Sequence, residues 1–190
     1  MGREFITIVS GLPRSGTSMM MQAIEAGGIP TLTDNIRKSD QDNPKGYYEF
    51  EAVKKTREDA SWLEDAAGKV VKMVYRLLYD LPQDREYRVV FMRRKLQEVL
   101  ASQKVMLERL GQDQGNVTDD KMAEMFRKQL NAFDQWVQQQ DCFRILYTDY
   151  GKVLESPLQQ FRLVSEFLGG DLDVRAMAAV VDPSLYRQRL

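Results

Sequence analysis

The chain has 190 residues, 43% hydrophobic and 29% charged, which is an ordinary globular composition and enough chain for one α/β domain. Its net charge of −1 provides no basic footprint for nucleic acid or an anionic membrane. Histidine is absent, which excludes a Ser-His-Asp triad, a histidine base and an imidazole metal ligand, and the single cysteine, Cys142, excludes an internal disulfide. We therefore expect a single domain over residues 1–190, no bound metal ion, and a base supplied by Glu, Asp, Lys, Tyr or the substrate.

The first residues carry no export or anchoring signal. Met1-Gly2 begins like a myristoylation signal, but Ile6 stands where Ser or Thr is required. The sequence contains no signal-peptide pattern and no apolar run of about 18 residues. A cytoplasmic location is therefore expected.

Residues 5–9 (Phe-Ile-Thr-Ile-Val) predict a buried parallel strand, and residues 19–26 predict a helix that stops at Gly27-Gly28. The turn between them, residues 10–18 (Ser-Gly-Leu-Pro-Arg-Ser-Gly-Thr-Ser), is bracketed by glycines. Such a turn directs backbone N–H groups inward, and the helix start adds free N–H groups and the positive end of the helix dipole. The order strand, turn and helix therefore predicts a phosphate-binding loop.

The loop departs from the P-loop pattern G-x-x-x-x-G-K-[ST] at one position. Gly11, Gly16 and Ser18 match, but Thr17 stands where the phosphate-binding lysine belongs. The loop provides instead one cation, Arg14, three positions earlier. Since a triphosphate needs that lysine and Mg²⁺, the loop favours a donor with less charge.

Residues 28–47 predict a surface loop of functional length, which includes Asp42-Asn43-Pro44-Lys45-Gly46. The following aromatic and acidic stretch, Tyr47 to Glu51, leads into an expected helix to about Asp59. Its aromatic residues either form a pocket wall or cover the edge of the sheet. The candidates for a wall are Tyr47, Tyr48 and Phe50.

The rest of the chain alternates strands and helices. A helical piece at 61–68 precedes an expected strand at 69–75, whose Lys72 must reach a rim or an anion. Strands at 87–92 and 143–147, helices at about 96–110 and 119–140, and a helix that Ser156-Pro157 begins and Gly169-Gly170 ends complete the pattern. This alternation predicts an α/β fold with a parallel sheet.

A second anion site is expected at Arg94 and Ser102, which are separated by seven residues across a strand-to-helix junction. Together with the loop at 11–18, this pattern resembles the sulfotransferases that use 3′-phosphoadenosine 5′-phosphosulfate (PAPS). The resemblance implies a three-layer, P-loop NTPase-like sulfotransferase fold. It also implies 5′-phosphosulfate binding by Pro13, Arg14, Ser15, Gly16, Thr17 and Ser18 and 3′-phosphate binding by Arg94 and Ser102.

Three further stretches resemble this family. Lys72 corresponds to its strand lysine near the sulfonate, and Phe167-Leu168-Gly169 to its helix end. Tyr147-Thr148-Asp149 corresponds to its strand-end motif, which implies that Tyr147 contacts adenine. The terminal Asp182-Pro183-Ser184-Leu185-Tyr186-Arg187 is similar to a segment of short bacterial members.

The chain also departs from the family pattern. Val74 stands where cytosolic members carry a catalytic histidine, and their C-terminal Arg-Lys-Gly clamp is not found. Glu49 is the best positional match to the glutamate base of other branches; alternatively, it is an exposed carboxylate that favours a helix dipole.

The resulting hypothesis is metal-independent, in-line sulfuryl transfer from PAPS to a hydroxyl or amine acceptor, with release of 3′-phosphoadenosine 5′-phosphate (PAP). Arg14, Lys72 and Glu49 are the expected catalytic residues. Two alternatives stay open: a P-loop kinase of a nucleotide or adenylyl sulfate, and a silent module that binds PAPS or PAP. The acceptor is not specified, and its pocket is either shallow, completed by residues 28–47, or formed with a second subunit in a homodimer.

Overall fold

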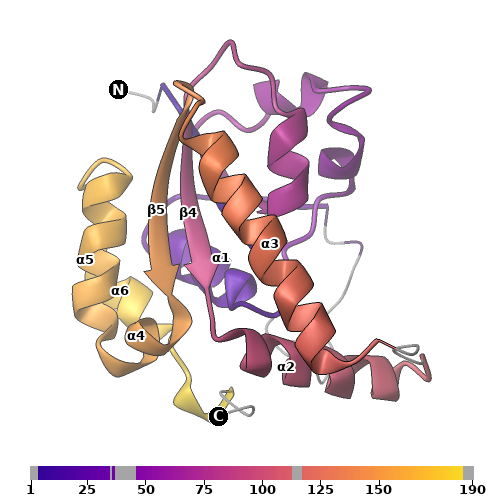
Figure 1. Ribbon diagram of the computed structural model, residues 1–190. Helices are drawn as coiled ribbons and strands as arrows, with labels where there is room; N and C mark the ends of the chain where they lie inside the picture. The colour runs from indigo at the N-terminus through magenta and orange to yellow at the C-terminus, as the bar shows by residue number, and fades with distance from the viewer. Residues whose placement is uncertain (1–3, 35, 37–45, 113–116, 186–190) are drawn as a thin grey trace.

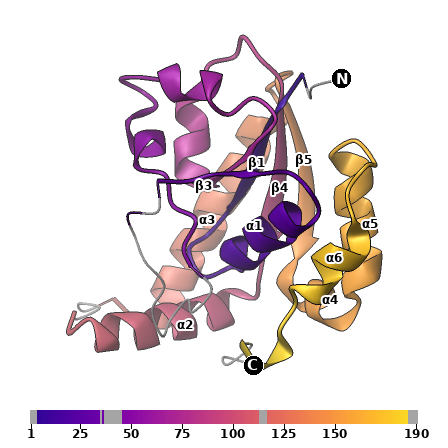
Figure 2. The same cartoon turned by 180° about the vertical axis from the view of Figure 1, so that it is seen from behind.

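Five parallel strands form one sheet in the order β2-β3-β1-β4-β5 (Figures 1 and 2). The computed structural model describes residues 4–34, 36, 46–112 and 117–185. The strands are β1 (Ile6–Gly11), β2 (Thr31–Leu32), β3 (Val70–Val74), β4 (Tyr87–Arg93) and β5 (Phe143–Asp149). The predicted α/β fold with a parallel sheet is confirmed.

Helices cover both faces of the sheet, which gives three layers (Figure 2). They are α1 (Thr17–Ala26), α2 (Leu96–Arg109), α3 (Asp119–Val137), α4 (Tyr150–Glu155), α5 (Pro157–Phe167) and α6 (Val174–Ala179). Alternate residues of the central strands point to opposite faces. Ile8 and Phe91 pack in the core that includes Phe133 of α3, whereas Val9 packs in the core that includes Met20 of α1.

Several predicted elements differ from the structure. The expected helices over 51–59 and 61–68 are the short 3₁₀ helices η1 (Glu51–Lys55) and η2 (Ser61–Glu64), and further 3₁₀ helices follow, η3 (Tyr75–Asp80) and η4 (Pro183–Leu185). The segment predicted as one loop over 28–47 contains β2, which pairs with β3 through Thr31 and Val70. The helices α4 and α6 were not predicted, and α3 ends three residues earlier than expected. Ser156 precedes α5 at the N-cap position, but its side chain makes no capping hydrogen bond.

The strand register brings three chain segments to one edge of the sheet. Gly11 at the end of β1 is aligned with Val74 on β3 and with Met92 on β4. The segments that follow these strands therefore begin side by side, and Lys72, which is aligned with Val9, lies two residues before the end of β3. Ligands of open α/β sheets bind at this carboxyl edge.

Candidate functional site

The turn that follows β1 lies so close to the backbone of β4 and to the ring of Tyr150 that only glycine fits at two positions. Gly11 has φ of +147°, and a Cβ there would lie 2.6 Å from the carbonyl oxygen of Met92. Gly16 has φ of +97°, and its Cβ would lie 2.4 Å from the ring of Tyr150. Both glycines are thus required by contact as well as by backbone conformation.

Between these glycines, Arg14 adopts φ of +71°, a left-handed conformation that is uncommon for residues with a side chain. The buried hydroxyl of Ser15 donates to the carbonyl of Leu12 at 2.7 Å and closes the turn. The helix α1 begins immediately afterwards, at Thr17, so the N–H groups of its first turn have no partner within the helix. The loop therefore presents backbone donors and one guanidinium.

A cavity of about 370 Å³ lies against this loop. It brings together nine of the eleven site residues predicted from the sequence. They are Pro13, Arg14, Gly16, Thr17, Ser18, Glu49, Lys72, Arg94 and Ser102. Ser15 and Tyr147 do not line this cavity.

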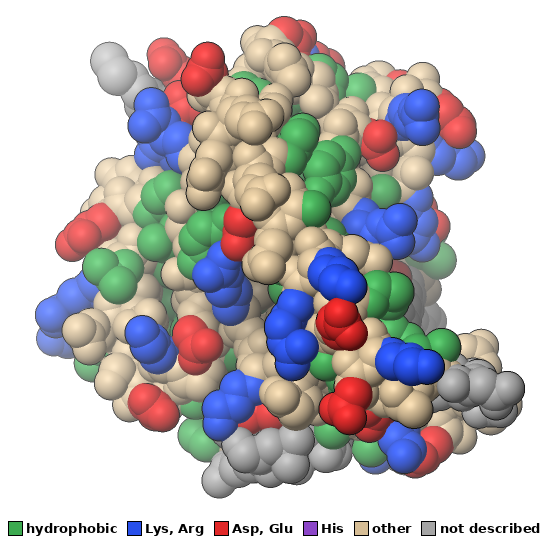
Figure 3. Space-filling view, viewed as in Figure 1, with side chains coloured by type: hydrophobic (Ala, Val, Ile, Leu, Met, Phe, Trp, Pro, Cys, Tyr) green, Lys and Arg blue, Asp and Glu red, His purple; other side chains and the backbone are tan. Residues whose placement is uncertain are grey.

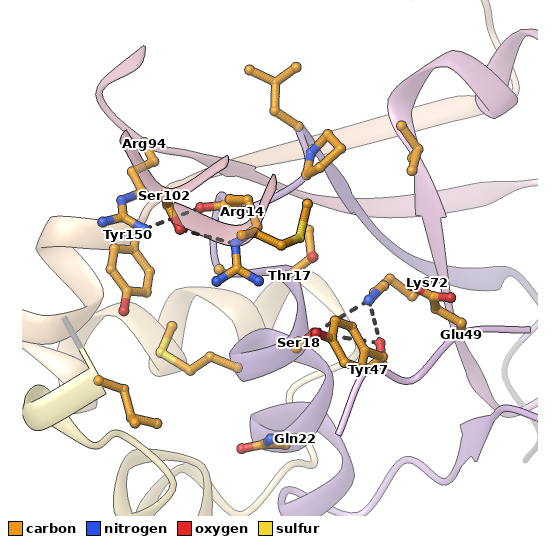
Figure 4. Close-up of a pocket in the computed structure, with 18 of the residues that line it drawn as sticks. Arg14, Thr17, Ser18, Gln22, Tyr47, Glu49, Lys72, Arg94, Ser102 and Tyr150 are labelled. Carbon is orange, nitrogen blue, oxygen red and sulfur yellow. Dashed lines mark hydrogen bonds between the residues drawn. The ribbon is translucent and has the colours of Figure 1, made fainter. Parts of the chain in front are cut away.

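One end of the cavity is organised by Lys72 (Figure 4). Its ammonium group donates to the hydroxyl of Ser18 at 3.3 Å and to the backbone carbonyl of Tyr47. The side chain of Glu49 lines the same end, and its backbone carbonyl accepts a hydrogen bond from the Thr33 hydroxyl at 2.8 Å. A cation and a carboxylate thus lie together where β3 ends.

The other end is organised by Arg94 (Figure 4). Its Nε donates to Glu98 Oε2 at 2.9 Å, and its Nη1 donates to the carbonyl of Arg14 at 3.2 Å. The two side chains of this ion pair are only 9% and 2% exposed. The guanidinium also lies 4.8 Å from the ring centroid of Tyr150. Arg94 is therefore fixed by charge, by hydrogen bonds and by an aromatic ring.

Arg14 connects the two ends. In Figure 4 its side chain lies between the Lys72 group and the Arg94 group, and its Nε donates to the hydroxyl of Ser102 at 3.0 Å. The two predicted anion sites are thus parts of one continuous cavity. A molecule that carries negative charge at two separated positions matches this arrangement.

Tyr147 lies outside the cavity, on the side of β5 that faces α3. Its hydroxyl donates to Asp134 at 2.5 Å, and the guanidinium of Arg93 lies 3.7 Å from its ring centroid. The geometry therefore does not support the predicted adenine contact. Tyr150, which does line the cavity, is the first residue of α4, and the N-terminus of this helix is capped by the carboxylate of Asp149. The sequence pattern that could have identified Tyr150 is a strand that ends at an N-cap aspartate, Asp149, and is followed directly by a helix.

Of the three aromatic residues proposed for a pocket wall, only Tyr47 lines the cavity. Tyr48 has φ of +55° and turns away, so that its hydroxyl donates to Glu25 at 3.1 Å. Phe50 packs edge-on against Trp62 with ring centroids 6.1 Å apart. Met20 and Met21 are fully buried in the core. The neighbouring residues Pro44 and Lys45 lie outside the described part of the chain, as do Met1, Gly2, Tyr186 and Arg187.

Two tyrosines near the site stay protonated at neutral pH. Burial, together with the Glu25 carboxylate, raises the pKa of Tyr48 to about 12. Burial and the hydrogen bond to Asp134 likewise raise the pKa of Tyr147 to about 12. Neither phenol is suited to accept a proton from a substrate.

On the face shown in Figure 3, lysine and arginine side chains are interspersed with aspartate and glutamate. Among the residues described, no cluster of three or more His, Cys, Asp or Glu side chains could hold a metal ion. None of the helices within the described ranges is both long enough and apolar enough to cross a membrane.

A parallel α/β sheet with a glycine-bracketed loop after its central strand is typical of the α/β folds that bind nucleotides at this edge. Comparison with solved structures then identifies the particular fold. The sulfotransferase domain from the curacin biosynthetic pathway has a TM-score of 0.54 and 14% sequence identity, over 100% of this chain and 93% of that domain. The resemblance predicted from the sequence is confirmed at the level of the fold, which is that of the sulfotransferases.

Two other similar structures contain PAP. Mouse sulfotransferase SULT7A1 complexed with PAP has a TM-score of 0.51 and 17% identity, over 94% of this chain and 63% of that one. Retinol dehydratase in complex with androsterone and PAP has a TM-score of 0.51 and 15% identity, over 92% of this chain and 62% of that one. No protein-family model and no curated protein matches the sequence itself.

Proposed function

We propose that the protein is a sulfotransferase that moves a sulfuryl group from PAPS to a hydroxyl or amine acceptor. The proposal rests on one observation: the two anion sites, Lys72 with the loop and Arg94 with Ser102, share one cavity in a sulfotransferase fold. PAPS carries phosphate groups at its 5′ and 3′ positions, so its two charged ends fit two such sites. The PAP in two similar structures supports the same donor.

In this proposal, the loop and Lys72 stabilise the leaving group. PAPS supplies the sulfuryl group: its sulfur–oxygen bond breaks while the acceptor oxygen or nitrogen bonds to sulfur, and the electron pair remains on the phosphate of PAP. Arg14, Lys72 and the loop N–H groups are the donors available to stabilise that growing negative charge. Glu49 accepts the proton of the acceptor. Positive charge is supplied by side chains, so no step requires a metal ion.

The donor site is tested by calorimetric titration of the metal-free protein with PAP, in parallel with ATP and Mg²⁺. PAP is expected to bind, and Arg94→Ala to weaken PAP binding about 10- to 100-fold, the effect of losing a hydrogen bond to a charged group. Lys95→Ala is the control for the loss of a nearby positive charge, because the Lys95 side chain also lies 4.0 Å from Glu98, is 66% exposed and does not line the cavity. Preference for ATP with Mg²⁺ contradicts the proposal and favours the kinase alternative.

Glu49→Gln is expected to lower kcat about 10²- to 10⁴-fold without changing PAP affinity, since a general base acts only on the acceptor. The measurement is steady-state PAP formation combined with the PAP titration above. Glu51→Gln provides the control, because this nearby carboxylate pairs with Lys54 at 2.6 Å and does not line the cavity. An unchanged kcat in Glu49→Gln means that another group takes the proton. PAP binding without any PAP formation in the wild-type protein supports the silent binding module instead.

A further inference from the structure

One face of α2 extends the cavity beyond the proposed donor site. Ser102, Val105, Met106 and Arg109 all line the cavity, and their spacing of three, four and seven residues from Ser102 places them on one side of the helix. Seven residues of α-helix rise about 10 Å. This face of α2 therefore carries, in order, the Ser102 hydroxyl that contacts Arg14, two apolar side chains and the guanidinium of Arg109.

The direction of α2 places Arg109 on the side opposite to β5. Figures 1 and 2 agree that α2 starts below the end of β4 and runs toward and beyond the side of the sheet on which β3 lies. Lys72 and Val74 belong to β3, and both line the cavity. The C-terminal part of α2, which carries Val105 and Arg109, thus lies toward the side of the sheet that carries Lys72, where the sulfuryl group would leave the donor.

The side chains in this part suit a molecule that is apolar along its length. Pro13 and Val74 line the cavity together with Val105 and Met106, and Val74 is 39% exposed, although it is an apolar residue at a strand end. A ligand that covers this apolar surface removes it from water, which contributes favourably to the free energy of binding.

The charged side chains of the cavity place a second requirement on the acceptor. Among the described residues, the cavity is lined by four cationic side chains, Arg14, Lys72, Arg94 and Arg109, and by two carboxylates, Glu49 and Asp182. Of these four cations, Arg109 is the one that belongs to α2, seven residues from Ser102, and a guanidinium can bind a carboxylate through two parallel hydrogen bonds.

We propose, on the basis of the sulfotransferase function above, that the acceptor is an apolar hydroxyl compound with a carboxylate at its far end. Its apolar body packs on Val74, Val105 and Met106, and its carboxylate pairs with Arg109. The hydroxyl then points back to Lys72 and Glu49. Arg109 thereby selects acidic acceptors over neutral ones of the same shape.

The test uses a matched pair of probes, 6-hydroxy-2-naphthoate and 2-naphthol, titrated calorimetrically into PAP-saturated protein. The acid is expected to bind at least about 10-fold more tightly, the effect of one charge-assisted pair. Arg109→Gln should reduce its affinity to that of the neutral probe, whereas Arg109→Lys should retain part of the preference. Lys104→Gln, an exposed charge on α2 that does not line the cavity, should change neither value. Thermal unfolding of the variants separates this effect from the favourable interaction of Arg109 with the C-terminal end of the helix dipole.

Equal affinity for the two probes, or no binding of either, overturns the proposed acceptor class. A loss of PAP affinity in Arg109→Gln as large as the loss of acid affinity also overturns it, because Arg109 would then bind the donor. The preceding PAP titration on the same sample reports the donor site independently. A failure of the acceptor proposal is therefore distinguishable from a failure of the sulfotransferase proposal.

Discussion

Replacing Arg14 with glycine is expected to lower the rate of PAP formation about 10²- to 10³-fold, the usual loss when one donor to a developing oxyanion is removed. The same substitution should leave the folded state as stable as before, or more stable. Arg14 has φ of +71°, which glycine adopts without the steric cost of a Cβ. Activity should therefore fall without a loss of stability.

Arg14→Ala is the matched variant, because it removes the same guanidinium but retains a Cβ in the left-handed conformation. Its rate should equal that of Arg14→Gly, while its free energy of unfolding should be about 1 kcal/mol lower. Steady-state PAP release and urea denaturation measure the two quantities. If Arg14→Gly retains more than about a tenth of the rate, Arg14 is not the principal donor to the leaving group.

Gly11→Ala is expected to lower the free energy of unfolding by about 2 to 5 kcal/mol, the sum of overpacking and left-handed backbone strain. The new Cβ would lie 2.6 Å from the carbonyl oxygen of Met92, which belongs to the neighbouring strand, and 2.7 Å from Ser15 Oγ, which holds the turn. Neither atom is the free end of a flexible side chain. Relief of the clash therefore requires β1 and β4 to separate locally, and PAP binding should be lost with it.

Gly68→Ala separates the two contributions. Gly68 has φ of +70°, so alanine is strained there, but no atom lies within 4 Å of the added Cβ. Its cost should be about 1 kcal/mol, the contribution of strain alone. Guanidinium chloride denaturation of both variants measures the difference. Equal losses in the two variants would show that the contact between the loop and β4 is not what requires glycine at position 11.

The central part of the fold could be predicted because local signals agree there. A β-branched strand, a glycine-bracketed turn and a helix occur in sequence, and the carboxyl edge of a parallel sheet brings Arg14, Lys72 and Arg94 together without any knowledge of side-chain contacts. The site residues that line the cavity lie in or next to these strongly patterned segments.

The remaining features depend on tertiary contacts. The strand β5 extends to Asp149, two residues beyond the predicted end, so Tyr147 stays in the strand and faces α3, while Tyr150 begins the next helix. The segment over 51–64 forms short 3₁₀ helices because its buried residues, such as Val53 and Trp62, pack against the core on separate short turns. The strand β2 has two residues, too few for a period to be read.

The ion pair between Arg94 and Glu98 has a consequence for the proposed binding of the donor 3′-phosphate. An arginine side chain that is ordered only on binding loses rotamer freedom at that moment, which costs about 0.5 to 1.5 kcal/mol of affinity. Here the carboxylate of Glu98, the carbonyl of Arg14 and the ring of Tyr150 already restrict that freedom. The loss of rotamer freedom of Arg94 is therefore part of the free energy of folding and does not reduce the affinity for the proposed donor. Glu98, which does not line the cavity, helps to hold the Arg94 guanidinium in position before a ligand binds.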